Sequence, residues 1–310
     1  MNIEKRAVAG AAVAAMLLAP VAGSASQLVL TTCGRVPAQV TAVLAGDLSC
    51  AYHCASDETK PCDLADPDAS CGRLQDSCEP DTIALGAGAQ LRLNGHTIHP
   101  AYQGDGVVCG EPGERGTCSV FGPGRIAGEK GIGVFGRSMN VVLRNLTIDG
   151  SDAAVITDGK LMASYLQLGE DRENGLSAGG TMFLRNVSLG VDGAHVPGNI
   201  FVSNVIVRGR IEAGGDVRGS GVRLVRKGIT AKNVILSDVF GAYTPGQDGP
   251  GSVVARERLR LTRSSVTGNE VYDGVPDLVS GRRPELVRTR CDNSARYDDR
   301  SVSWNVCRDD

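Results

Sequence analysis

Along the middle of the chain, apolar and polar residues alternate in short segments that share one form. Each copy begins with Asn, continues with an apolar–polar–apolar triplet and is soon followed by Gly or Asp. The copies cover residues 145–148, 186–189, 204–207 and 233–236, with Tyr165 opening a fifth at 165–168 and a degenerate last copy at 265–266. Alternation with period two predicts β-strands that bury one face.

The spacing of these copies indicates a repeat architecture. Successive copies are 20, 21, 18, 29 and 32 residues apart. A period near twenty with short strands is typical of a β-solenoid, whereas helical solenoids need roughly 33 residues or more per repeat. The two longer steps contain Gly/Pro-rich runs, which we interpret as loops or as one extra coil. Asn suits a turn because it tolerates left-handed backbone, and stacked Asn side chains can hydrogen-bond from coil to coil.

The N-terminal residues predict export. Lys5 and Arg6 precede an apolar stretch from 7 to about 22, and this stretch closes on small residues. Gly23 and Ala25 suit a signal-peptidase site, so we expect cleavage near Ala25. No later segment is long and apolar enough to span a bilayer. We therefore expect a secreted or periplasmic protein without a membrane span.

All ten cysteines follow this segment. An even number of cysteines behind a signal peptide indicates disulfides in an oxidising compartment. The middle of the chain has none, which predicts disulfide-bonded caps at both ends of an elongated body. Abundant glycine and an aromatic content of only 4% fit many tight turns around a narrow core. The cysteines are Cys33, Cys50, Cys54, Cys62, Cys71, Cys78, Cys109, Cys118, Cys291 and Cys307.

Several short motifs resemble one family. Cys33-Gly34, the segment Asp47-Leu48-Ser49-Cys50, residues 91–98 (LRLNGHTI) and residues 303–307 (SWNVC) are similar to elements of bacterial secreted right-handed parallel β-helix repeat proteins of the pectin-lyase-like superfamily. The resemblance implies an all-β fold, a single right-handed parallel β-helix, and a Cys33–Cys50 disulfide. It covers nearly the whole mature chain, and the insert at 51–80 departs from it.

These observations divide the chain into a signal peptide (1–25), a Cys-rich N-terminal cap and insert (26–80), the parallel β-helix (81–268) and a C-terminal cap (269–310). If Cys33 pairs with Cys50, the four cysteines of the insert form two bridges among themselves. Short loops favour the pairs Cys109–Cys118 and Cys291–Cys307.

Polar residues directly after each strand triplet are expected to line one ridge, because stacked coils repeat about every 4.8 Å. Carboxylates two coils apart would lie roughly 10 Å apart, near the range for inverting glycoside hydrolysis, and an Asp beside a His could abstract a proton. The alternative is that Asp is simply frequent in turns. The ridge comprises Asp149, Asp152, Glu170, Asp171, Asp192, His195, Arg208, Arg210 and Asp238.

Roles follow from this placement. Asp192 and His195 are the first acid–base candidates, and Glu170 and Asp149 come next. Arg208 and Arg210 are expected to hold substrate carboxylates through bidentate hydrogen bonds.

A second candidate binding feature is an arginine stripe. Strand alternation predicts Arg256, Arg258 and Arg260 on one face, with Leu259 and Leu261 pointing inward. Such a stripe could bind carboxylate or sulfate groups. The alternative is a solvated face, in keeping with the net charge of −3.

Metal and cofactor chemistry has little support in the sequence. His96 and His99 are three apart and would point to opposite faces of a strand. An acidic run at 57–68 could hold Ca²⁺ but lacks the EF-hand spacing. We expect no metal or cofactor.

Two function classes stay open. Fold alone does not assign activity in this superfamily, and the signature clusters of polygalacturonase-type hydrolases and pectate lyases are absent. The favoured hypothesis is a lyase or hydrolase acting on an extracellular, possibly acidic, polysaccharide. The alternative is a non-catalytic cell-envelope or extracellular protein that binds glycan or a partner surface. Nucleic acid is not expected as a ligand, and a monomer is expected.

Overall fold

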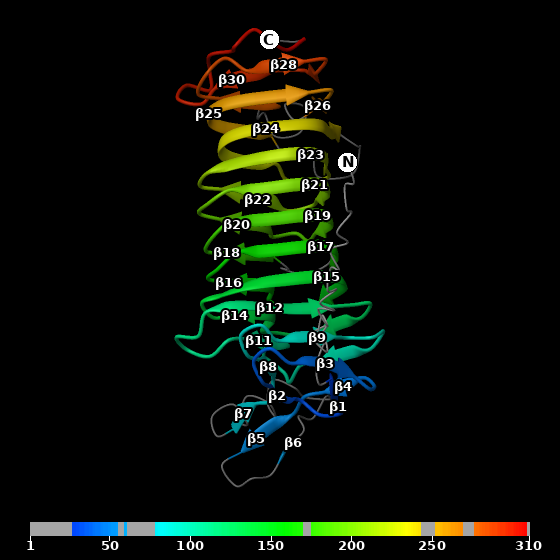
Figure 1. The fold of residues 1–310 in the computed structure, drawn as a ribbon. Coiled ribbons are helices and arrows are strands. Elements are labelled where there is room, and N and C mark those ends of the chain that lie inside the picture. The colour runs from blue at the N-terminus through cyan, green and yellow to red at the C-terminus, as the bar shows by residue number, and fades with distance from the viewer. Residues whose placement is uncertain are drawn as a thin grey trace, which may run out of the picture.

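The chain winds into a column of stacked β-strands (Figure 1). The computed structural model describes residues 27–54, 59–60, 78–169, 175–242, 252–268 and 276–308. Within these residues the regular structure is entirely β, and one 27-stranded sheet, paired in parallel from coil to coil, contains nearly all of it. The protein is a parallel β-solenoid, which confirms the predicted β-helix.

Each coil contributes strands to three stacks, A, B and C, which follow one another along the chain. Stack A contains β2 (Gly34–Val36), β8 (Ile83–Leu85), β11 (Val107–Cys109), β14 (Ile132–Gly136), β16 (Ala153–Thr157), β18 (Gly175–Ala178), β20 (Gly193–Val196), β22 (Arg210–Ala213), β27 (Leu278–Ser280) and β30 (Ser294–Arg296). Stack B begins with β1 (Gln27–Leu30), β3 (Thr41–Leu44), β9 (Gln90–Arg92) and β12 (Gly116–Phe121), and ends with β28 (Glu285–Val287). Stack C begins with β4 (Leu48–Ser49), β10 (Thr97–His99) and β13 (Arg125–Ala127), and ends with β26 (Ser265–Thr267) and β29 (Arg290–Cys291).

In the central coils a single bent strand supplies both B and C. These strands are β15 (Met139–Asp149), β17 (Leu161–Leu168), β19 (Met182–Leu189), β21 (Ile200–Val207) and β23 (Asp216–Leu224). The next two strands also extend back into stack A: β24 (Ile229–Ala242) crosses all three stacks, and β25 (Val253–Thr262) crosses A and B.

One residue per coil makes the bend between stacks B and C. These residues are in register and adopt left-handed backbone, with φ between 49° and 70°. We name them the corner column: Asn145, Tyr165, Asn186, Asn204, Gly221, Asp238, Arg263 and Arg288. Asn204 Nδ2 donates to Asn186 Oδ1 at 3.2 Å, so the predicted Asn ladder exists in this part of the column.

Asn233 departs from the expected phase. It pairs in register with Asp216 at the beginning of stack B, whereas Gly221 and Asp238 occupy the corner of their coils. The Asn-plus-triplet pattern occurs at both places, because each is a turn followed by a half-buried strand. The coils after Asn204 are therefore shorter than the sequence spacing implied.

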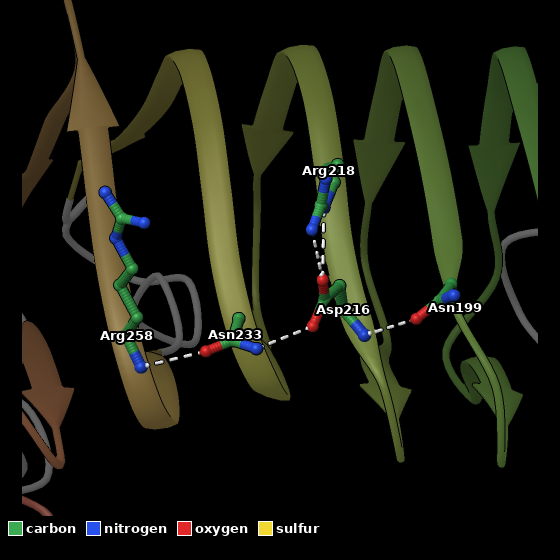
Figure 2. A network of polar contacts seen from close by, with 5 residues as sticks. All are labelled: Asn199, Asp216, Arg218, Asn233 and Arg258. Atoms are coloured by element: carbon green, nitrogen blue, oxygen red, sulfur yellow. Dashed lines mark hydrogen bonds and ion pairs between the residues drawn. The ribbon is translucent and has the colours of Figure 1, made fainter.

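At the beginning of stack B, polar side chains connect four coils (Figure 2). The Asp216 amide donates to Asn199 Oδ1 at 2.8 Å, and Asn233 Nδ2 donates to Asp216 Oδ1 at 2.7 Å. The Arg258 amide then donates to Asn233 Oδ1 at 3.2 Å. We name Asn199, Asp216 and Asn233 the Asn–Asp column. It satisfies turn backbone groups that the sheet leaves unpaired.

The core is a stack of aliphatic layers. In stack C, equivalent inward positions are in register and buried from coil to coil, each worth about 1.5–3 kcal/mol when fully buried. One such layer contains Ile98, Ile126, Ile148, Leu168, Leu189 and Val207, all fully buried.

Disulfides lie at both ends, as expected. The pairs Cys33–Cys50, Cys109–Cys118 and Cys291–Cys307 are all formed. The strands of both predicted cap regions also pair in parallel with their neighbours, so these regions add coils to the solenoid.

The insert contains a separate antiparallel sheet of β5 (Tyr52–Cys54), β6 (Thr59–Lys60) and β7 (Cys78–Pro80). In it, the backbones of Cys54 and Cys78 are directly paired. Cys62, Cys71 and the expected signal peptide lie outside the described residues. No helix that could cross a membrane occurs in the described part of the chain.

Candidate functional site

The predicted ridge is divided between two places. Asp149 and Arg208 occupy the same position at the end of stack C, three coils apart. Gly169 and Gly190 occupy this position on the two coils between them. His195 lies instead within stack A, in register with Ser177 and Glu212. The turns that join stacks C and A differ in length, so residues counted from the end of a triplet do not form one column.

Two ridge carboxylates form ion pairs with arginines of neighbouring coils. Arg125 donates to Asp149 from Nε at 2.9 Å and from Nη2 at 2.8 Å. Arg263 donates to both oxygens of Asp238, at 2.9 and 2.8 Å, and these hydrogen bonds lower the pKa of Asp238 below its ordinary value. Both carboxylates therefore have arginine partners within the solenoid, which suits a structural role better than proton transfer.

The first acid–base candidates are exposed on the outer face of stack A. His195 Nδ1 lies 3.7 Å from Glu212 Oε2, and the two side chains are 64% and 42% exposed. Asp192 is exposed in the turn just before this strand. Glu170 and Asp171 lie outside the described residues. The described candidates therefore occupy open, solvated positions.

A hollow that includes the ridge residue Arg208 lies along the corner column. It has a volume of about 640 Å³ and is bounded by the corner and by the outer face of stack C. We name it the corner groove. Its lining repeats the same strand positions over four coils: Tyr165, Leu166, Gln167, Asn186, Val187, Ser188, Asn204, Val205, Ile206, Arg208, Gly221 and Arg223.

The chemistry of this lining is distinctive. It combines amide and hydroxyl groups with two arginines and an aromatic ring, and none of its described residues is a carboxylate. Arg208 donates to Ser188 Oγ, which fixes its guanidinium against the sheet. Arg223 is exposed on the next coil, and Tyr165 is 51% exposed. The corner groove is thus a positively charged surface rich in hydrogen-bonding groups.

The arginine stripe is only partly continuous. Arg258 and Arg260 flank the buried Leu259, as expected, but the register shifts between Ala231 and Asn233 and separates Arg256 from this alternation. Arg258 Nη2 donates to Glu285 Oε1 at 2.9 Å, and Arg260 Nε lies 3.9 Å from Glu285 Oε2. Part of the positive charge in this stripe is therefore neutralised by Glu285.

Across the corner from the groove, stack B carries an exposed apolar stripe. Phe183 and Phe201 stack with ring centroids 5.0 Å apart and planes at 11°, and Met162 and Val142 continue the same row. The sequence does contain a signal for this stripe, because each member lies three residues before a corner residue. The parallel stacking of the two rings fits a contribution to coil–coil packing.

No group of three or more His, Cys, Asp or Glu side chains suitable for a metal occurs among the described residues. The acidic run at 57–68 lies almost wholly outside them. No protein-family model, curated protein or solved structure matches this chain.

Proposed function

We propose that this protein binds an anionic polysaccharide in the corner groove without transforming it. One observation carries the proposal: the groove combines two arginines with neutral hydrogen-bonding side chains and an exposed tyrosine, and no carboxylate occurs among the described residues of its lining. A polar, positively charged, open surface is suited to an extended anionic chain, whereas small apolar ligands favour deep cavities.

Each group in the lining has a role toward such a ligand. The amides of Gln167, Asn186 and Asn204 can exchange hydrogen bonds with sugar hydroxyls. Arg208 and Arg223 can hold carboxylate or sulfate groups through bidentate hydrogen bonds. The electron-rich face of an aromatic ring such as that of Tyr165 can pack against the C–H face of a sugar.

The hydrolase or lyase hypothesis has weaker support. Acid–base catalysis needs a carboxylate or imidazole within hydrogen-bonding reach of the reacting bond. Neither group occurs among the described residues that line the corner groove, and the His195–Glu212 pair lies exposed on stack A. A binding function therefore accounts for more of the described surface than a catalytic one.

The test is a binding assay on a panel of acidic and neutral polysaccharides with the mature protein. Arg208→Ala and Arg223→Ala are each expected to weaken binding of an acidic polysaccharide about tenfold, because each removes one charge-assisted contact of about 1.4 kcal/mol. Arg283→Ala changes an exposed arginine outside the groove and is the matched control. Equal loss in all three variants, or binding to none of the glycans, would contradict the proposal.

The same panel separates binding from catalysis. Products are followed by absorbance of unsaturated sugars and by reducing ends. We expect no product from any bound glycan. Product formation that is lost in both Asp192→Asn and His195→Ala would instead establish the catalytic hypothesis.

A further inference from the structure

We infer that the bound glycan lies parallel to the solenoid axis, spans the coils from Tyr165 to Phe240, and carries negative groups on successive sugars at the Arg223 end. This inference rests on the proposed function and deepens it. It assigns a direction, a length and a charge pattern to the ligand, and it assigns Phe240 to the site.

The direction follows from how the lining is arranged. The lining positions recur at the same register on four successive coils, and few of them come from any one strand. A hollow built in this way is elongated across the strands. An extended ligand in it therefore follows the axis along which the coils stack.

The length follows from two exposed aromatic residues. Gln167, Ser188, Ile206 and Arg223 form one outward row of stack C, and Phe240 is the next member of this row. Phe240 is 55% exposed, and Tyr165 is 51% exposed beside the first member. Four coil steps separate the ends of the row, or roughly 19 Å at about 4.8 Å per coil.

A sugar unit of an extended chain covers roughly the same distance as one coil, about 5 Å. Four coil steps therefore accommodate four to five sugar units. Phe240 is placed to pack against the last of them, as Tyr165 is placed to pack against the first.

The charge pattern follows from a basic cluster at one end. Arg208 and Arg223 lie on adjacent coils, about 4.8 Å apart along the axis, and Arg208 lies two residues farther along its coil, so the two arginines can hold anionic groups of neighbouring sugars. Arg210 is exposed at the beginning of β22, and Arg226 and Lys227 are exposed in the turn that follows β23. Among the described residues, the lining near Tyr165 carries no positive side chain, and the exposed Arg144 and Arg185 lie before the corner, on stack B. The described groove residues therefore favour negative charge mainly toward Arg223, and on the Phe240 coil the corner carboxylate Asp238 is paired with Arg263.

Calorimetry with size-defined mannuronate oligosaccharides of two to eight units tests the inference. Neutral manno-oligosaccharides and sulfated oligosaccharides of the same lengths form the comparison sets. Affinity of the acidic series should rise up to about five units and then level off, and the neutral series should bind at least tenfold more weakly. Sulfated ligands that match the acidic series would identify the recognised feature as charge alone, in agreement with the inference.

Phe240→Ala should weaken binding of five-unit and longer acidic ligands about tenfold and leave dimers and trimers unchanged. Phe240→Tyr should restore affinity. Tyr297→Ala, which removes an aromatic side chain that is 39% exposed elsewhere, should have no effect.

Affinity that is independent of length, or a Phe240→Ala effect equal for short and long ligands, would overturn the inference and leave the proposed function intact. Equal binding of the neutral series would overturn the charge pattern. If no anionic oligosaccharide of any length binds, the proposed function itself fails.

Discussion

Replacing Asp216 should loosen the solenoid locally, because this carboxylate connects its own coil to the coil of Asn233 in the Asn–Asp column. Its Oδ1 accepts a hydrogen bond from Asn233 at 2.7 Å, and its Oδ2 accepts from Arg218 Nη2 at 2.6 Å (Figure 2). The Asp216 side chain is only 18% exposed, whereas that of Arg218 is 53% exposed. Asp216→Ala removes both interactions and leaves the side-chain Nδ2 of Asn233 without this acceptor.

The magnitude can be estimated from these two contacts. A hydrogen bond to a charged group contributes about 1.5–3 kcal/mol, and an ion pair with a largely exposed partner contributes about 0.2–1 kcal/mol. We expect Asp216→Ala to cost about 2–3 kcal/mol of local stability. Asp216→Asn keeps an acceptor for Asn233 and should cost about 1 kcal/mol.

The pH dependence has a definite sign. Burial alone would raise the pKa of Asp216, but the hydrogen bonds from Asn233 and Arg218 outweigh it and lower that pKa below its ordinary value of 3.8. The ionised carboxylate is therefore favoured by folding, and its contribution is complete above pH 3.8. The difference between the wild type and Asp216→Asn should shrink as pH falls through the lower pKa of the folded state.

Native-state hydrogen exchange is the appropriate assay, because solenoids can open coil by coil. The amide of Arg258, which donates to Asn233 Oδ1, should exchange faster in Asp216→Ala by the factor that 2–3 kcal/mol implies, about 30- to 150-fold. Asp298→Ala, an exposed change on a later coil, is the control. Equal exchange of this amide in Asp216→Ala and Asp298→Ala would refute the reasoning. A stability difference between the wild type and Asp216→Asn that widens in acid would also refute it.

Four further substitutions, one of them a matched control, test other parts of the fold by urea denaturation. Gly219→Ala should lower the free energy of unfolding by about 3 kcal/mol, because its Cβ would lie 1.8 Å from the Val202 carbonyl oxygen. Gly95→Ala is the control: its Cβ would have open space around it, and its positive φ should cost about 1 kcal/mol. Similar losses in the two variants would contradict this prediction. Burial raises the pKa of Asp105 despite its backbone hydrogen bond, so Asp105→Asn should stabilise the folded protein at pH 7. This gain should vanish as pH falls through the raised pKa, and a gain that persists in acid would exclude burial of the charge as its cause. Leu143→Ala, at a fully buried position, should cost about 2–5 kcal/mol, and a loss below 1 kcal/mol would mean that the layer collapses around the cavity.

The fold could be predicted because its signals are local. Alternation of apolar and polar residues with period two predicts which residues face inward. A left-handed turn favours Asn regardless of which residue lies on the next coil. Asn145, Asn186 and Asn204 were therefore placed in their correct role. The same local logic failed at Asn233, because a turn at the beginning of stack B carries the same signature. Only the register of neighbouring coils distinguishes the two positions.

The candidate site was less predictable because it depends on turn lengths. Arg208 was expected to bind substrate, and it does line the corner groove. Gln167, Ser188 and Arg223 were not identified, because an outward residue is recognised from sequence as polar but not as part of a hollow. Whether outward residues form a groove depends on how coils of different length superpose, and this cannot be derived from alternation within one strand.

The corner column has a consequence for how such a protein can change over time. Its members include asparagine, tyrosine, glycine, aspartate and arginine, and all share one backbone conformation. This backbone conformation is therefore compatible with side chains of very different chemistry. Since this column forms one wall of the corner groove, mutation can vary the recognition surface one coil at a time while the aliphatic layers beneath it stay the same.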